Sequence, residues 1–219
     1  MYDLHVHSNY SDGDASVEQI IKKAKESGLK AIAIVDHSME HRSGLNERKA
    51  KRRQDEIDKF SSRYDIEVLS GIECGIKADG EIFLPHFKFD LILASIHDFL
   101  YADEYYHRII SCLKNNDFDI LAHLHSSMFG SLNGRDPNKD VEIVDLLVER
   151  DIALEINTAH SAPPTDFVTM LNERCGVKKI KVKYSVGSDS HSLRRIGDVS
   201  WGFNVARKYL KNGKFILDL

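Results

Sequence analysis

Most of the residues that could do chemistry in this sequence are histidines and carboxylates at the ends of short apolar runs or just after them. The chain has 11 histidines in 219 residues, and seven of them follow this pattern. Buried imidazoles and carboxylates cost free energy unless they are paired or bind a metal ion. The pattern therefore predicts one polar site that holds metal ions, built from these groups in chain order: His5, His7 and Asp12; Asp36 and His37; Glu73; His97; His123 and His125; Glu155 and Asn157; Asp189 and His191.

Two of these groups have the spacing of metal ligands on an extended strand. His5 and His7 are two residues apart, so their imidazoles point to the same face and can bind one ion. Asp189 and His191 repeat this spacing with an oxygen ligand, and Glu73 has two oxygens with which to bridge two ions. Three nearby glycines are expected to allow tight turns or close backbone approach: Gly13, Gly71 and Gly187.

The elements that must position these residues are parallel strands. Short β-branched or apolar runs alternate with helical patterns, as in βαβ units. Seven such runs predict an α/β fold, a barrel of parallel strands whose C-terminal rim collects the polar residues, with an open doubly wound sheet as the alternative. The runs are Tyr2–Val6, Lys30–Val35, Ile66–Gly71, Asp90–Ile96, Asp119–Ala122, Ile152–Ile156 and Val182–Val186.

Local signals mark the ends of two helices. Ser16 with Gln19 three residues later forms a capping box, which predicts a helix start. Pro163 and Pro164 suit the start of a later helix, which Gly176 is expected to end.

Two segments between the runs carry weaker signals. An Asp-Gly turn in the irregular segment Gly75–Phe89 predicts a small hairpin. The basic run Arg48–Arg53 is followed by acidic residues within two turns, which predicts a solvated helix face and not a nucleic-acid patch.

Composition sets the class of protein. A chain of 24.9 kDa that is 42% hydrophobic and 29% charged suits one domain over residues 1–219. No stretch approaches about 18 consecutive apolar residues, which excludes a membrane span. Three separated cysteines and an N-terminus without signal-peptide character predict a reduced, cytoplasmic setting. The net charge of −4 argues against a protein that coats nucleic acid.

The ordered motifs resemble those of the PHP (polymerase and histidinol phosphatase) family from residue 3 to about residue 198. The HxH opening also occurs in amidohydrolases, so the order of all four motifs carries the resemblance, with His97 and His123 between the third and fourth. The family fold is a distorted, TIM-like (β/α)7 barrel, which agrees with the seven runs. The motifs are His5-Val6-His7-Ser8-Asn9-Tyr10-Ser11-Asp12-Gly13, Asp36-His37, Gly71-Ile72-Glu73 and Gly187-Ser188-Asp189-Ser190-His191.

This resemblance implies a trinuclear site for two or three divalent zinc, manganese or iron ions at the C-terminal rim. An oxygen ligand at Asp12 would favour Mn²⁺ or Fe²⁺ there. Matched to the family, one ion would take His5, His7, Glu73 and Asp189; a second would share Glu73 and take His97 and His123; the third would take Asp12, His37 and His191.

Some matches leave alternatives. His123 aligns with the family ligand, but relatives often have proline where this chain has Leu124, so His125 competes with it. Asn157 and His160 are interpreted as groups that bind substrate or support the ligands.

The resemblance also implies a histidinol-phosphatase-like phosphoesterase acting on a small-molecule phosphomonoester. Cations about 3.5–4 Å apart lower the pKa of a bridging water toward about 7 and bind phosphate oxygens. We predict in-line attack by that hydroxide without a covalent enzyme intermediate. Glu73, Asp12 and His191 are the predicted catalytic residues, and Asp12 or His191 would protonate the leaving alkoxide.

Arginines beside the last motif are candidates for phosphate recognition. Arg194 and Arg195 follow it directly, and a guanidinium binds phosphate through paired hydrogen bonds. The alternative is an ordinary basic loop. Arg135, after the fifth run, is a weaker candidate.

Three other functions compete with the phosphomonoesterase. The first is a phosphodiesterase or nuclease acting on nucleotides or DNA ends. The second is an amidohydrolase-type deacylase, in which a modified lysine bridges the metals where this chain has Glu73. The third is a metal-binding scaffold without activity. The length of the chain favours a free-standing phosphatase module, while substrate, metal identity and oligomeric state stay open.

Overall fold

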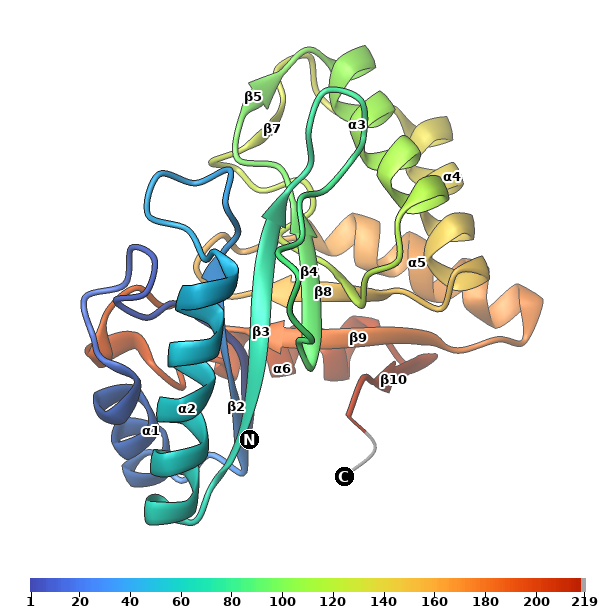
Figure 1. The fold of residues 1–219 in the computed structure, drawn as a ribbon. Coiled ribbons are helices and arrows are strands. Elements are labelled where there is room, and N and C mark those ends of the chain that lie inside the picture. The colour runs from blue at the N-terminus through green and yellow to red at the C-terminus, as the bar shows by residue number, and fades with distance from the viewer. Residues whose placement is uncertain (218–219) are drawn as a thin grey trace.

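All seven predicted runs form parallel strands in the computed structural model, which describes residues 1–217 (Figure 1). Several are buried on both faces, and every residue of β2 is buried, as expected for continuously apolar strands. The strands are β1 (Tyr2–Val6), β2 (Ala31–His37), β3 (Glu67–Gly75), β4 (Leu91–Ser95), β6 (Ile120–Leu121), β8 (Ala153–Asn157) and β9 (Val182–Gly187).

These strands form one curled parallel sheet in the order β1-β2-β3-β4-β6-β8-β9-β10. The sequence did not predict β10 (Gly213–Phe215), which pairs with the start of β9. At the end of β1, the amide of Asp189 donates to the carbonyl of His5 at 2.8 Å, and just beyond it the amide of His7 donates to the carbonyl of Ser190 at 2.9 Å. The curl thus brings the first predicted strand to the last, which confirms the α/β, distorted-barrel prediction.

Helices cover the outside of the sheet. On one flank lie α1 (Val17–Glu26) and α2 (Glu47–Tyr64); on the other lie α3 (Ala102–Asn115), α4 (Pro137–Glu149) and α5 (Thr165–Lys178) (Figure 1). The helix α6 (Ser200–Tyr209), preceded by the 3-10 turn η1 (Leu193–Arg195), packs against β8 and β9. The predicted capping box starts α1, with the Gln19 amide donating to the Ser16 hydroxyl at 3.3 Å.

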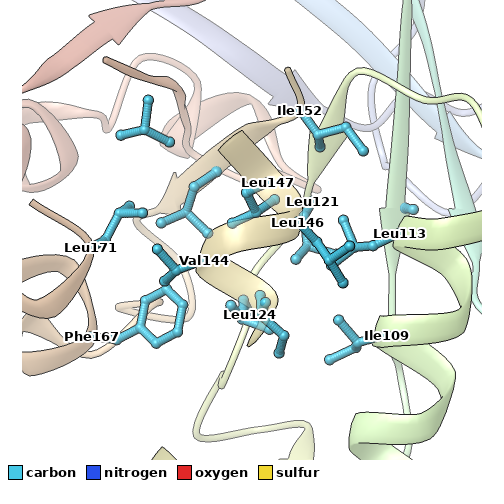
Figure 2. Packing of buried hydrophobic residues seen from close by; sticks show 14 of the residues in the cluster. Ile109, Leu113, Leu121, Leu124, Val144, Leu146, Leu147, Ile152, Phe167 and Leu171 are labelled. Atoms are coloured by element: carbon cyan, nitrogen blue, oxygen red, sulfur yellow. The ribbon is translucent and has the colours of Figure 1, made fainter. Parts of the chain in front are cut away.

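The largest apolar cluster lies between α3, α4, α5 and the sheet (Figure 2). Ile109, Leu121, Val144 and Phe167 contribute to it from four different elements and are all nearly or fully buried. Burying such side chains contributes roughly 1.5–3 kcal/mol each. This core fixes the helices behind the C-terminal ends of β6 and β8, where polar residues emerge.

Two local predictions were wrong. The segment Gly75–Phe89 contains the predicted turn, in which the Lys77 amide donates to the Glu81 carbonyl at 3.0 Å, but residues 76–90 form no strand and therefore no hairpin. Gly176 does not end its helix, because α5 continues to Lys178 and closes on Lys179 in the left-handed conformation.

A small parallel pair, β5 (Phe99–Leu100) with β7 (Gly130–Ser131), projects beyond the end of the sheet toward which β3 points (Figure 1). This is the C-terminal end of the strands, so the pair stands above the rim. Among the described residues, no helix is long and apolar enough to cross a membrane.

Candidate active site

The predicted polar residues converge on Glu73, which lies in β3 and is almost completely buried. Its Oε1 lies 3.0 Å from His123 Nε2 and 3.2 Å from His97 Nε2, and its Oε2 lies 3.1 Å from His37 Nδ1. These histidines stand at or just beyond the ends of three different strands. One carboxylate therefore joins β2, β3, β4 and β6 at the rim.

His5 in β1 and His7 just beyond its end meet next to this carboxylate. His5 Nε2 and His7 Nε2 are 3.1 Å apart, so both imidazoles point to one place as their spacing predicts. His7 Nε2 lies 3.3 Å from Asp189 Oδ1, and His5 Nε2 lies 3.5 Å from Glu73 Oε2. All four side chains are buried.

Asp12 forms the outer part of the cluster. Its Oδ2 lies 3.4 Å from His191 Nε2 and 3.5 Å from His37 Nε2, and its Oδ1 lies 3.5 Å from His7 Nδ1. The side chains of Asp12 and His191 are 33% and 42% exposed, whereas Glu73 and His7 are buried. This edge of the cluster therefore faces solvent.

The donor set fits divalent transition-metal ions. Three groups of side chains place their ligand atoms within 4.8 Å of one another: His7, Asp12, His37 and His191; His5, His7 and Asp189; His37, Glu73 and His97. In addition, Nδ1 of His7 is buried without a hydrogen-bond partner. Such imidazole and carboxylate sets suit zinc, manganese and iron. Because His7 and His37 each belong to two groups, the predicted division of ligands among three ions stays a prediction.

The charged groups of the cluster shift one another's pKa values. Burial raises the pKa of Glu73, but the charges of the surrounding histidines, led by His97, outweigh burial and hold that pKa well below its usual range. Burial lowers the pKa of His37, yet the charges of Glu73 and Asp12 raise it to about 10. The carboxylates therefore stay ionised, and positive charge collects around them.

A buried glutamate, Glu155, holds two of the ligand histidines in place. Glu155 Oε1 lies 2.7 Å from His5 Nδ1, and its Oε2 accepts a hydrogen bond from the His123 amide at 2.9 Å. A carboxylate on Nδ1 leaves Nε2 of His5 free to face the cluster. Asn157, fully buried, donates to Asp189 at 3.1 Å and to Glu155 at 3.0 Å. The structure thus places Asn157 behind the ligands, away from solvent.

Gly187 and Gly13 show why the motifs contain glycine. A Cβ at Gly187 would lie 2.5 Å from the Cβ of His5 and 2.6 Å from Glu155 Oε1. A Cβ at Gly13 would lie 2.4 Å from the carbonyl oxygen of His7. The close approach expected at both positions is confirmed, because any side chain there would displace the backbone or side chain of His5 or His7.

The structure separates His123 from its competitor. His123 lies in the cluster, whereas the buried side chain of His125 points away from it, and its Nε2 lies 2.8 Å from Asp140 Oδ1. Arg135 donates from Nε to Asp140 at 2.9 Å, so it too lies in this second group and does not line the cavity. His123 and His125 both have a positive φ, of 28° and 56° respectively.

The prediction of a fully solvated basic face on α2 was wrong for Arg53. This side chain is completely buried, and its NH1 donates to Asp36 Oδ2 at 2.7 Å. Asp36 in turn accepts from the Ser8 amide at 2.8 Å and the Ser11 hydroxyl at 2.7 Å, which fixes the loop that carries Asp12. A signal existed in the helical period, because Arg53 shares the buried face of Ala50, Ile57 and Phe60.

A cavity of about 710 Å³ opens over the exposed edge of the cluster. Of the residues predicted to bind substrate, Arg195 and His160 line this cavity. His160 Nε2 lies 3.0 Å from Asp189 Oδ2. Arg194 is exposed and does not line the cavity. The sequence missed other lining side chains that carry no motif, including His41, Arg108 and Phe129. The ring of His41 lies 4.6 Å from that of His37.

Comparisons with known proteins identify relatives of this chain. A family model for the PHP domain matches residues 3–159. The DNA polymerase/3'-5' exonuclease PolX of Bacillus subtilis strain 168 is 28% identical over 226 residues, but this chain spans only 38% of its length. A probable phosphatase of Shewanella piezotolerans is 25% identical over 221 residues, which cover 90% of this chain and 81% of that protein.

Two solved structures share the fold. Histidinol phosphate phosphatase HISK from Lactococcus lactis, in complex with zinc, L-histidinol and phosphate, has a TM-score of 0.71 and 21% identity, covering 95% of this chain and 93% of that one. The putative histidinol phosphatase hisK from Listeria monocytogenes has a TM-score of 0.68 and 17% identity, with 90% and 97% covered.

Proposed function

The chain belongs to the PHP family of metal-dependent phosphoesterases, and from that premise we propose that it hydrolyses a small-molecule phosphomonoester. The observation that carries the proposal is the convergence on Glu73. Histidines from β1 and from the ends of β2, β4 and β6 surround this carboxylate within 3.0–3.5 Å, at the floor of an open cavity. Arg195 stands at the wall of the same cavity, where a guanidinium can bind phosphate oxygens.

Nine side chains would hold the ions: His5, His7, Asp12, His37, Glu73, His97, His123, Asp189 and His191. When bound, the ions supply charge to stabilise the phosphoryl group and to activate water. Glu155 and Asn157 keep the inner ligands in place through the hydrogen bonds described above. Asp12 and His191 lie next to each other at the solvent-facing edge of the cluster beside the cavity, so they remain our candidates for the proton that the leaving alkoxide needs.

The second candidate function is phosphodiester cleavage at nucleotides or DNA ends. The alignment with PolX, which runs over 99% of this chain, favours it. Against it, the buried Arg53 and the net charge of −4 leave less positive surface for a nucleic-acid strand.

The test is a phosphoester panel on protein whose metal content has been measured. We expect phosphomonoesters, including histidinol phosphate and nucleoside monophosphates, to be hydrolysed faster than a bis-aryl diester. Glu73→Gln should lower the bound metal per chain and abolish turnover, while Glu67→Gln, at the exposed start of the same strand, should change neither. Dominant diesterase turnover, or full metal content and activity in Glu73→Gln, would refute the proposal.

A further inference from the structure

One wall of the cavity is aromatic and takes no part in the proposed metal binding. Phe129 precedes β7 and lines the cavity together with Met128. Its ring packs edge-on against His97 at 5.5 Å between centroids and lies 5.5 Å from the ring of His160. The phenyl group therefore borders the place where a phosphoester bound at the cluster would project its leaving group.

The wall continues outward as exposed apolar surface. Met128, Phe99 and Leu132 are 56%, 57% and 55% exposed, although all three are large and hydrophobic. They lie on or beside the β5–β7 pair, and the rings of Phe99 and Phe129 are 6.4 Å apart. Scattered exposed apolar residues need no explanation, but a group that continues a cavity lining marks a ligand-binding surface.

Hydrogen bonds fix the position of this wall relative to the metal-ligand cluster. The Gly130 amide donates to the Asp98 carbonyl at 3.2 Å, next to His97. The Met128 amide donates to the Ser126 hydroxyl at 3.0 Å, and that hydroxyl lies 3.0 Å from Nδ1 of His160. Because both ends of the segment are tied to residues of the site, the ring is positioned before substrate arrives.

We propose that Phe129 and Met128 form a subsite for an apolar, aromatic leaving group of the substrate. The inference rests on the proposed function and narrows its substrate class to phosphomonoesters of aromatic alcohols or heteroaromatic analogues. A flat ring gains from offset or edge contact with Phe129, and the polarizable thioether of Met128 adapts to its outline. A hydrophilic leaving group of the same reactivity gains neither contact.

The experiment compares benzyl phosphate with ethyl phosphate, which are both esters of primary alcohols. With water, the first yields benzyl alcohol and inorganic phosphate: the P–O bond to the alkoxide breaks, a P–O bond to water oxygen forms, and the water proton ends on the alkoxide. We expect kcat/KM for benzyl phosphate to exceed that for ethyl phosphate by about tenfold. Phe129→Ala should remove most of this ratio, because kcat/KM for benzyl phosphate falls more than kcat/KM for ethyl phosphate; the bound metal per chain is measured for each variant.

Phe203→Ala is the matched control, because this half-buried phenylalanine on α6 does not line the cavity. It should keep the wild-type ratio. Phe129→Leu, which retains an apolar side chain, should fall between the wild type and Phe129→Ala. Equal turnover of the two esters by the wild type, or an unchanged ratio in Phe129→Ala, would overturn the subsite while leaving the phosphomonoesterase intact.

Binding of the non-hydrolysable benzylphosphonate and ethylphosphonate tests the subsite separately from turnover. We expect the metal-loaded protein to bind the benzyl compound about tenfold more tightly, and Phe129→Ala to lose that preference. If neither ester is hydrolysed but the benzyl preference in binding is present, the proposed function fails and the subsite stands. Equal binding of both phosphonates contradicts the subsite whatever the turnover.

Discussion

Replacing the buried Arg53 by methionine tests how the loop that carries Asp12 is held. Methionine keeps an unbranched side chain and removes the charge. In the wild type, NH1 donates to Asp36 at 2.7 Å and NH2 donates to the Gly71 carbonyl at 2.6 Å. The side chains of Arg53 and Asp36 are both 0% exposed, so water cannot replace the lost partner.

The expected loss follows from the carboxylate left behind. Breaking a buried ion pair by removing one partner costs about 3–5 kcal/mol, because the other charge stays buried. Asp36 keeps its hydrogen bonds from Ser8 and Ser11, which places Arg53→Met near about 3 kcal/mol. For a chain of this size the melting temperature should fall by roughly 6–12 °C. The double variant Asp36→Asn/Arg53→Met should recover at least half of the loss, since no charge remains buried.

The assay is urea unfolding of metal-free protein followed by far-UV circular dichroism at pH 8 and pH 5. In the wild type, burial raises the pKa of Asp36, but Arg53 outweighs burial and the pKa lies below its ordinary value. That stabilisation is present above the unfolded pKa of about 3.9 and is lost only below it. In Arg53→Met burial dominates and raises the Asp36 pKa, so lowering the pH from 8 to 5 stabilises the variant relative to the wild type and narrows the difference between them. A loss below 1 kcal/mol or a purely additive double variant would refute this reasoning.

Two further substitutions probe the supports of the site. Asp140→Asn should destabilise the protein by about 2–3 kcal/mol in urea unfolding, because the buried Asp140 accepts hydrogen bonds from His125 and Arg135. Asp145→Asn is the control on the same helix: Asp145 forms a half-exposed ion pair with Arg174, and its loss should cost under about 1 kcal/mol. Gly187→Ala should cost about 1–3 kcal/mol and lower the metal content measured by elemental analysis, since the new Cβ would displace the neighbouring β1; wild-type metal content in a folded variant would contradict the steric argument.

Much of the fold could be predicted because each central strand is indicated by a local pattern in the sequence. Each is a short, mainly apolar run that lies between helical patterns, because strands covered on both faces bury mostly apolar side chains. β10, by contrast, has three residues and no periodic pattern, and it forms only because β9 offers it a partner. β5 and β7 are shorter still, with two residues each, so no sequence pattern predicted the projecting strand pair that carries Phe99.

The site was predictable only in part, because residue type does not reveal which way a polar side chain faces. Asp36, Glu73 and Glu155 lie within the last three residues of β2, β3 and β8, and all three are buried carboxylates. Only the structure shows that Glu73 meets imidazoles on the cavity side, whereas Asp36 meets Arg53 and Glu155 meets Nδ1 of His5 behind them. A strand-end carboxylate therefore predicts membership of the polar network, and its partner decides whether it binds a metal or holds a residue that does.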